Sequence, residues 1–221
     1  MRLYSPADLP KLNRIDGGEN GRRYQTPEGN LYPSVTTIFS IIKNEFLDEW
    51  RARVGEEEAK KIAARAAARG TYIHEQCEYL LKNQTPPKNP LAKMLYNDNW
   101  RKFKPLVDQI GDVFALETPL YSNYLKVAGT VDCVGMWKDK LSIIDFKTSS
   151  RMKSHEDIES YWMQCAAYAV MWEERTGQPI NNLVILMSVD DEEPLVFEDR
   201  RNNWINKFID LRKVYAKTVG D

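Results

Sequence analysis

Short apolar runs bounded by turn residues characterise the second half of the chain. Five of these runs have the length and composition of β-strands: 112–122, 126–137, 141–148, 181–189 and 194–199. Residues 160–177 repeat apolar side chains at helical spacing and end at a glycine, and a second such segment covers 202–217. This alternation predicts a mixed central sheet flanked by helices, which is an α/β core.

The first half of the chain has a different, more polar pattern. Residues 47–82 are rich in Ala, Arg, Lys and Glu, which predicts helices, with interruptions expected at Gly55 and Gly70. A loop rich in proline follows, and then a further helix is expected at about 91–110. The sequence thus predicts a helical elaboration before the α/β core.

A hairpin is expected near the start of the chain. Residues 22–35 form two short runs around a Pro-Glu-Gly turn, and Ser34 can cap a helix that begins near Val35. We therefore expect a single domain, residues 1–221, with two parts: a helical N-terminal region at 1–110 and the α/β core at 111–221.

Composition indicates an ordinary globular protein, with 43% hydrophobic and 29% charged residues. No apolar run is long enough to cross a bilayer, and the first residues lack the apolar core of a signal peptide. The three cysteines, Cys77, Cys133 and Cys165, are odd in number and contain no C-x-x-C pair. This pattern argues against disulfides and against an iron–sulfur cluster, and it favours an intracellular setting, the cytoplasm of a cell or of a phage-infected host.

The formal net charge of −1 means that a polyanionic partner must be met by a local basic patch. Lys61, Arg65 and Arg69 recur at every fourth position of a predicted helix and form a candidate stripe. Glu57 and Glu58 lie within one turn of Lys61, so the alternative is a solvated face with ordinary helix ion pairs.

The end of the third strand places an acid and a base side by side. Asp145 and Lys147 are two residues apart and therefore share one face of the strand. If the preceding turn is centred between Lys138 and Asp139, Asp132 lies directly opposite Asp145. A three-residue turn would break this register.

Two carboxylates at that distance repel each other unless a cation lies between them. Hard oxygen ligands of this kind suit Mg²⁺ or Mn²⁺, and such a metal can polarise a phosphodiester. Lys147 could then stabilise the charge that develops on the phosphate. The alternative is a simple ion pair between Asp145 and Lys147 at a strand edge.

Four motifs in order resemble the RecB branch of the PD-(D/E)XK nucleases: "RGTYIHEQCEYLL", "GTVD", "DFKT" and "QCAAY". The segment "PSVTTI" is similar to one found in the mitochondrial genome maintenance exonucleases of that branch and in their phage and bacterial relatives. The resemblance covers about residues 32–168 and implies a restriction-endonuclease-like core. Val131 stands where the motif of the superfamily has proline.

The resemblance implies a role for each residue that matches a motif. Metal ligands are implied at four positions: His74, Asp132, Asp145 and the backbone carbonyl of Phe146. Lys147 matches the catalytic lysine, and Gln164 and Tyr168 match a glutamine and a tyrosine near the active site, with Gln164 expected in catalysis and Tyr168 in DNA binding.

Other interpretations of these side chains stay open at this point. His74 could be a satisfied core histidine, and Gln164 and Tyr168 could be the polar edge of a packed helix. Glu78 shares a helix face with His74, and Glu117 is either an acid that supports the metal ligands or a plain edge residue.

Taken together, the motifs predict a DNA exonuclease that depends on Mg²⁺ or Mn²⁺ and hydrolyses phosphodiester bonds from free ends. The resemblance implies single-stranded DNA as the substrate and a place in DNA repair, recombination or replication. Lys61, Arg65, Arg69 and Tyr168 are the expected DNA contacts. The alternatives are an exonuclease of the lambda type that acts on duplex ends, a structure-specific endonuclease, and a non-catalytic DNA-binding subunit of a recombination complex.

Overall fold

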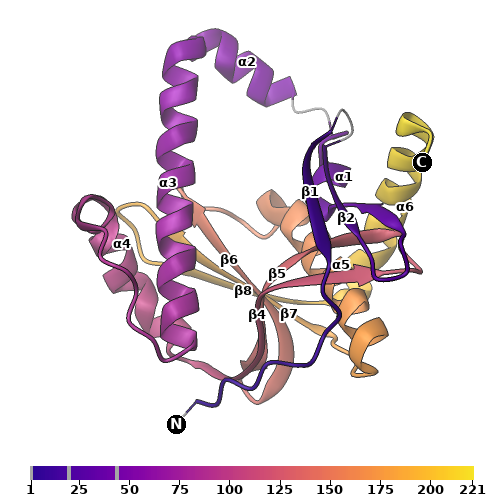
Figure 1. Cartoon of the computed structure of the whole chain (residues 1–221). Helices are drawn as coiled ribbons and strands as arrows, with labels where there is room; N and C mark the ends of the chain where they lie inside the picture. Colours follow the sequence, from indigo (N-terminus) through magenta and orange to yellow (C-terminus); the bar gives the residue numbers. More distant parts are fainter. Residues whose placement is uncertain (1, 19–20, 43–44) are drawn as a thin grey trace.

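A five-stranded mixed sheet forms the centre of the protein, in a computed structural model that describes residues 2–18, 21–42 and 45–221 (Figure 1). In spatial order its strands are β4 (Ile110–Ser122), β5 (Val127–Trp137), β6 (Lys140–Ser149), β7 (Asn182–Val189) and β8 (Leu195–Arg200). Strands β6 and β7 are parallel and the other neighbours are antiparallel. The predicted α/β core is confirmed, and each predicted strand boundary lies within two residues of the observed one.

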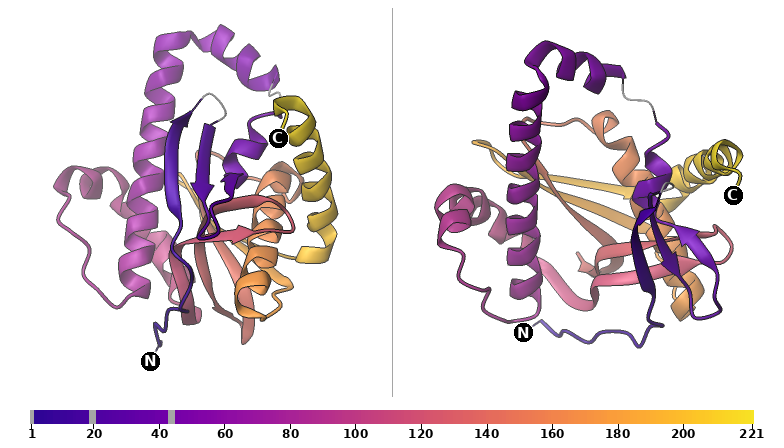
Figure 2. Two further views of the ribbon diagram at one scale, coloured as in Figure 1. Left: turned by 45° about the vertical axis from the view of Figure 1, so that its right-hand side comes forward. Right: turned by 45° about the horizontal axis from the view of Figure 1, so that its top comes forward.

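Helices cover both faces of this sheet, as the two views of Figure 2 show. Helices α5 (Glu159–Thr176) and α6 (Arg201–Val219) pack on one face, and α3 (Glu56–Leu81) and α4 (Pro90–Val107) pack on the other. Adjacent residues of β6 alternate between the two layers, because Ile143 belongs to the cluster around α5 and Ile144 to the cluster around α3.

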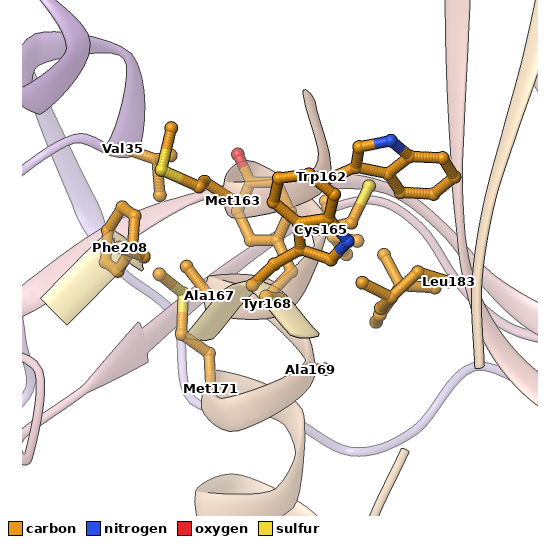
Figure 3. Packing of buried hydrophobic residues seen from close by; sticks show 14 of the residues in the cluster. Val35, Trp162, Met163, Cys165, Ala167, Tyr168, Ala169, Met171, Leu183 and Phe208 are labelled. Carbon is orange, nitrogen blue, oxygen red and sulfur yellow. The ribbon is translucent and has the colours of Figure 1, made fainter. Parts of the chain in front are cut away.

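Helix α5 supplies most of one core. Nine of its residues are buried, and they contact side chains from α1, α6 and β7, such as Val35, Phe208 and Leu183 (Figure 3). The helix ends where the sequence predicts, because Gly177 adopts the left-handed conformation (φ 72°) that closes a helix C-terminus.

The N-terminal region contains a small sheet in addition to helices. Strands β1 (Asn13–Gly18), β2 (Gly21–Gln25) and β3 (Leu31–Pro33) pair in that order, so the expected hairpin is present but carries a further strand. Strand β1 has few apolar residues, so no alternation marked it in the sequence. The Ser34 side chain caps α1 (Val35–Phe39) by accepting a hydrogen bond from the Thr37 N–H, as expected.

The long helical segment divides at one glycine only. Gly55 (φ 86°) separates α2 (Glu45–Val54) from α3, but Gly70 lies within α3 and does not interrupt it. The α3 helix passes close to β6 at this point, where Thr148 Oγ1 is 3.8 Å from the position that a Gly70 side chain would take.

Only the C-terminal half of α3 packs on the sheet. Tyr72, Ile73, Cys77 and Leu81 are buried, whereas every residue from 60 to 68 is exposed. Five of those nine exposed residues are alanine, the residue with the highest helix propensity, which suits a helix that gains little from packing. From the upper end of α3, α2 extends toward the small N-terminal sheet and α1 (Figures 1 and 2).

The helix expected at about 91–110 ends at Val107, because Ile110 already starts β4 and packs in the core beneath α3. Within the described ranges, no helix combines the length and the apolar character that a membrane span requires.

Candidate active site

The candidate site lies where the pairing of β5 and β6 ends. Trp137 pairs with Lys140 and Cys133 pairs with Ile144, which confirms the predicted register up to that point. One step further along, the Asp132 carboxylate accepts the Phe146 backbone N–H at 2.9 Å. The Asp132 side chain thus accepts a backbone hydrogen bond at the point where the pairing of β5 with β6 ends.

Strand β4 brings a third acid to the same place. Its neighbours Leu116 and Thr118 pair with Cys133 and Val131, which puts Glu117 beside Asp132. Glu117 has a left-handed backbone (φ 44°), a conformation that costs energy in a residue with a side chain. The sequence left Glu117 unassigned, and the structure places it in the cluster.

His74 reaches this cluster from α3. Its Nε2 lies 2.9 Å from the Phe146 carbonyl oxygen, and its Nδ1 lies 3.4 Å from Glu117 Oε1 and 3.8 Å from Asp132 Oδ2. Burial by itself lowers the pKa of His74, but the charge of Asp132 and the hydrogen bond to Glu117 outweigh burial and raise that pKa to about 9. The cluster therefore stabilises a positive charge at this point.

These residues fit a divalent cation. One ligand atom from each of His74, Glu117 and Asp132 lies within 4.8 Å of the others. Two carboxylates and an imidazole, with the Phe146 carbonyl adjacent, form a donor set dominated by hard oxygen atoms, which suits Mg²⁺ or Mn²⁺. Compared with the ligands expected from the sequence, Glu117 is added and Asp145 lies outside this group.

The Asp145 carboxylate instead forms an ion pair with one neighbour and accepts a hydrogen bond from another. Its Oδ2 lies 2.5 Å from Lys147 Nζ, and its Oδ1 accepts a hydrogen bond of 3.2 Å from Gln164 Nε2. Burial raises the pKa of Asp145 to about 6, with the Lys147 charge opposing the shift. Burial lowers the pKa of Lys147, but the charges of Asp145 and Asp132 outweigh it and raise that pKa. The ion pair proposed as the alternative is thus present, and it adjoins the cluster of His74, Glu117 and Asp132.

An aromatic ring also contacts the ammonium group of Lys147. The Lys147 Nζ lies 5.0 Å from the centre of the Tyr161 ring, within the range of a cation–π contact. Tyr161 precedes Gln164 by one turn of α5, so the same helix face contacts both members of the ion pair. No motif in the sequence marks Tyr161, although its position three residues before Gln164 is a usable signal.

Tyr168 lies on this helix face but its ring is buried in the core around α5 (Figure 3). Its hydroxyl oxygen occupies the space beside Gly129, where an added Cβ would lie only 2.8 Å away. Gly129, the glycine of "GTVD", is therefore needed so that Tyr168 fits. Because the Tyr168 ring is buried, it cannot stack on a base. Any contact of Tyr168 with DNA is therefore expected to involve its hydroxyl group.

The basic stripe expected on α3 is incomplete. Lys61 and Arg65 are exposed, but Arg69 is buried and forms an ion pair with Asp190, which also accepts a hydrogen bond of 3.0 Å from Asn99. Arg69 thus connects α3 with the end of β7 and with α4. Its charge is not exposed to solvent. The expectation that Arg69 lies on an exposed stripe is not met, because an acid from a distant segment pairs with it, and its contact with DNA stays a prediction.

Glu78 also lies apart from the cluster. Its Oε1 accepts a hydrogen bond of 2.5 Å from Lys82 Nζ, one turn further along α3. This is an ordinary pair at the C-terminal end of a helix. Glu78 therefore has its own partner in Lys82, and a role in supporting His74 stays a prediction.

The Arg69 pair allows a direct test by stability. Arg69→Ala is expected to lower the free energy of unfolding by about 2–3 kcal/mol, since it leaves Asp190 partly buried without its partner. Arg65→Ala removes the same charge one turn earlier, at an exposed position, and should change stability by less than about 0.5 kcal/mol. Urea unfolding of both variants checks this, and equal losses would contradict the burial of Arg69.

A cleft of about 280 Å³ opens over the cluster. His74, Glu117 and Asp132 form part of its wall, and α5 contributes Gln164. The small N-terminal sheet and the start of α1 complete it, so residues more than a hundred positions apart in sequence line one cavity.

Comparison with known proteins agrees with this architecture. The sequence pattern of the PD-(D/E)XK nuclease superfamily matches residues 45–203, more than half of the chain. Mitochondrial genome maintenance exonuclease 1 from Homo sapiens is 28% identical over 132 residues, covering 56% of this chain and 38% of that protein. The protein of the same name from Xenopus tropicalis is 29% identical over 175 residues, covering 73% and 50%.

The chain therefore spans about half or less of the length of these curated relatives. Among solved structures, an alkaline exonuclease from Laribacter hongkongensis superposes with a TM-score of 0.39 at 10% identity, covering 67% of this chain and 77% of that one.

Proposed function

Because the chain belongs to the PD-(D/E)XK nuclease superfamily, we propose that it is a metal-dependent DNA exonuclease. One observation carries this proposal: His74, Glu117 and Asp132 converge within 4.8 Å beside the buried ion pair of Asp145 and Lys147. The curated relatives named as exonucleases support the choice of exonuclease over endonuclease.

His74, Glu117 and Asp132 would hold the metal, with the Phe146 carbonyl beside them. A Mg²⁺ or Mn²⁺ ion held there would polarise a phosphodiester and activate water for its hydrolysis. Asp145 is proposed as a further ligand that also keeps Lys147 charged and oriented.

Lys147 is held between Asp145 and the Tyr161 ring, so its ammonium group is fixed before substrate arrives. A fixed positive charge stabilises the negative charge that develops on the phosphate during hydrolysis. Gln164 holds the other Asp145 oxygen and thereby positions the pair.

The substrate proposed is single-stranded DNA, taken from a free end. Helix α3 rises from His74 with all residues from 60 to 68 exposed, and α2 extends from its upper end toward the small sheet (Figure 1). Lys61 and Arg65 lie on this exposed part and can contact phosphates. The strand is proposed to pass beneath these helices, which a free end can do by threading and a closed circle cannot.

Linear single-stranded DNA is therefore expected to be degraded rapidly with Mg²⁺ or Mn²⁺, while the covalently closed circle of the same sequence resists. The reason is that a circle offers no end to thread. A time course on both substrates at equal concentration measures this.

The control is the same circle after a single cut, which should become a substrate at the rate of the linear strand. Comparable cleavage of the closed circle would rule out threading and favour the structure-specific endonuclease. Faster degradation of blunt duplex than of single strands would favour the enzyme that acts on duplex ends.

A further inference from the structure

A pair of arginines on the small N-terminal sheet shares one carboxylate. Asp16 Oδ2 accepts a hydrogen bond of 2.8 Å from Arg14 Nε, and Asp16 Oδ1 accepts one of 2.8 Å from Arg22 Nε. Arg14 and Asp16 are two residues apart on β1, and Arg22 lies on the neighbouring strand β2. Two guanidinium groups thus bind the two oxygens of one anionic group. A phosphate also has oxygens that can accept hydrogen bonds from such a pair.

Both arginines line the cleft that contains the metal-ligand cluster, whereas Asp16 does not. Their side chains are 48% and 40% exposed, so their outer N–H groups remain accessible to a ligand. Of the cleft-lining residues that the structure describes, the others whose side chains can carry a charge near neutral pH are His74, Glu117 and Asp132. The cleft therefore contains two cationic side chains in addition to the cluster of His74, Glu117 and Asp132.

The hairpin that carries the arginines is anchored to the sheet beside the cluster. Tyr24 of β2 is buried, and its hydroxyl lies 3.1 Å from Thr130 Oγ1, two residues before Asp132. The Arg22 carbonyl accepts hydrogen bonds of 2.9 Å from the Ser34 N–H and the Thr37 hydroxyl at the start of α1. The position of Arg22 is thus fixed relative to the candidate active site.

We propose that Arg14 and Arg22 form a binding site for a backbone phosphate of the nucleic-acid strand that enters the cleft. This inference rests on the proposed nuclease function. It adds the residues that hold the nucleic-acid strand in the cleft that contains the proposed metal ligands. Asp16 orients the two guanidinium groups through their Nε atoms and leaves their outer edges for the phosphate. With a net charge of −1, the chain needs such a local cationic site to hold a polyanion.

The test is equilibrium binding of a fluorescent single-stranded oligonucleotide to the full chain in chelator, over a series of salt concentrations. Arg14→Gln with Arg22→Gln should weaken binding and reduce the slope of log K against log salt by about 0.7, since the one lost phosphate contact contributes about 0.7 for single strands. Asp16→Asn should instead tighten binding, because it removes a negative charge beside the phosphate while retaining an acceptor oxygen.

The matched control replaces two cations that lie outside the cleft and also pair with a nearby aspartate, Arg101→Gln with Lys213→Gln. This control has the same change in net charge and should leave the slope within about 0.3 of the wild-type value, since it loses no phosphate contact. With metal present, the Arg14 and Arg22 double variant should raise KM and change kcat little.

Two outcomes would overturn the inference while leaving the proposed function intact. One is a wild-type chain that hydrolyses DNA while the Arg14 and Arg22 variant shows the slope and KM of the control. The other is an Asp16→Asn variant that weakens binding as much as the arginine replacements, which would assign all three residues to holding the hairpin. If the wild-type chain neither binds nor hydrolyses DNA, the proposed function itself fails.

Discussion

Asp132→Asn and Asp145→Asn are each expected to reduce DNA hydrolysis by about 10³-fold or more, as removal of divalent cations should. Asparagine keeps the size and one acceptor oxygen, so the contact between position 132 and the Phe146 N–H can persist. What is lost is the negative charge that attracts a cation. Isothermal titration with Mn²⁺ should show binding to the wild-type chain and a much weaker signal in both variants.

Glu117→Gln tests the ligand that the structure adds to the sequence prediction. It should weaken Mn²⁺ binding as Asp132→Asn does, because both side chains contribute an oxygen to the same cluster. Glu75→Gln is a suitable control, since Glu75 neighbours His74 in sequence but is not part of the cluster. Full hydrolysis in excess chelator, or unchanged Mn²⁺ binding in every variant, would refute a metal-dependent site.

Lys147→Gln is expected to lower kcat by about 10²-fold or more, the usual cost of removing one electrostatic stabiliser of the transition state. Glutamine can still donate a hydrogen bond to Asp145, so the variant avoids leaving a buried carboxylate without a partner. Binding of single-stranded DNA should change little, because one contact among several carries a small share of the affinity. Single-turnover rates at saturating DNA, together with binding isotherms, separate the two effects.

Lys140→Gln serves as the control for Lys147→Gln. Lys140 lies on the same strand β6 but at its exposed end, next to the turn. Its replacement removes the same charge and should leave both kcat and DNA affinity unchanged. If Lys147→Gln instead loses DNA binding and cleaves normally at saturation, Lys147 is a binding residue and the role assigned to it is wrong.

Much of the site is predictable because its decisive geometry is local. Lys138 and Asp139 both have positive φ (48° and 61°), as the central residues of a tight two-residue hairpin turn do. That turn sets the pairing of β5 with β6, and the period of two then places Asp132 and Asp145 at the same end. The caps at Ser34 and Gly177 are equally local, since each depends on backbone groups within one turn.

Two features could not be derived from sequence, because distant segments supply the partner. Arg69 was expected on an exposed stripe, but Asp190 from the end of β7 pairs with it and buries it. Glu117 joins His74 and Asp132 in one cluster only because the register of β4 on β5 sets it beside Asp132. Neither contact can be predicted from the spacing of residues along the chain.

By itself, then, the sequence determined the order of strands and helices, the register that brings Asp132 near Asp145, and the motifs that identify the nuclease superfamily. These follow from side-chain periodicity and turn chemistry, which act over a few residues. Only the tertiary structure decided which charges are buried and which face the cleft. Arg14 and Arg22 line the same cleft as the cluster because a small sheet packs against β5, and such placement depends on contacts between segments that are remote in the chain.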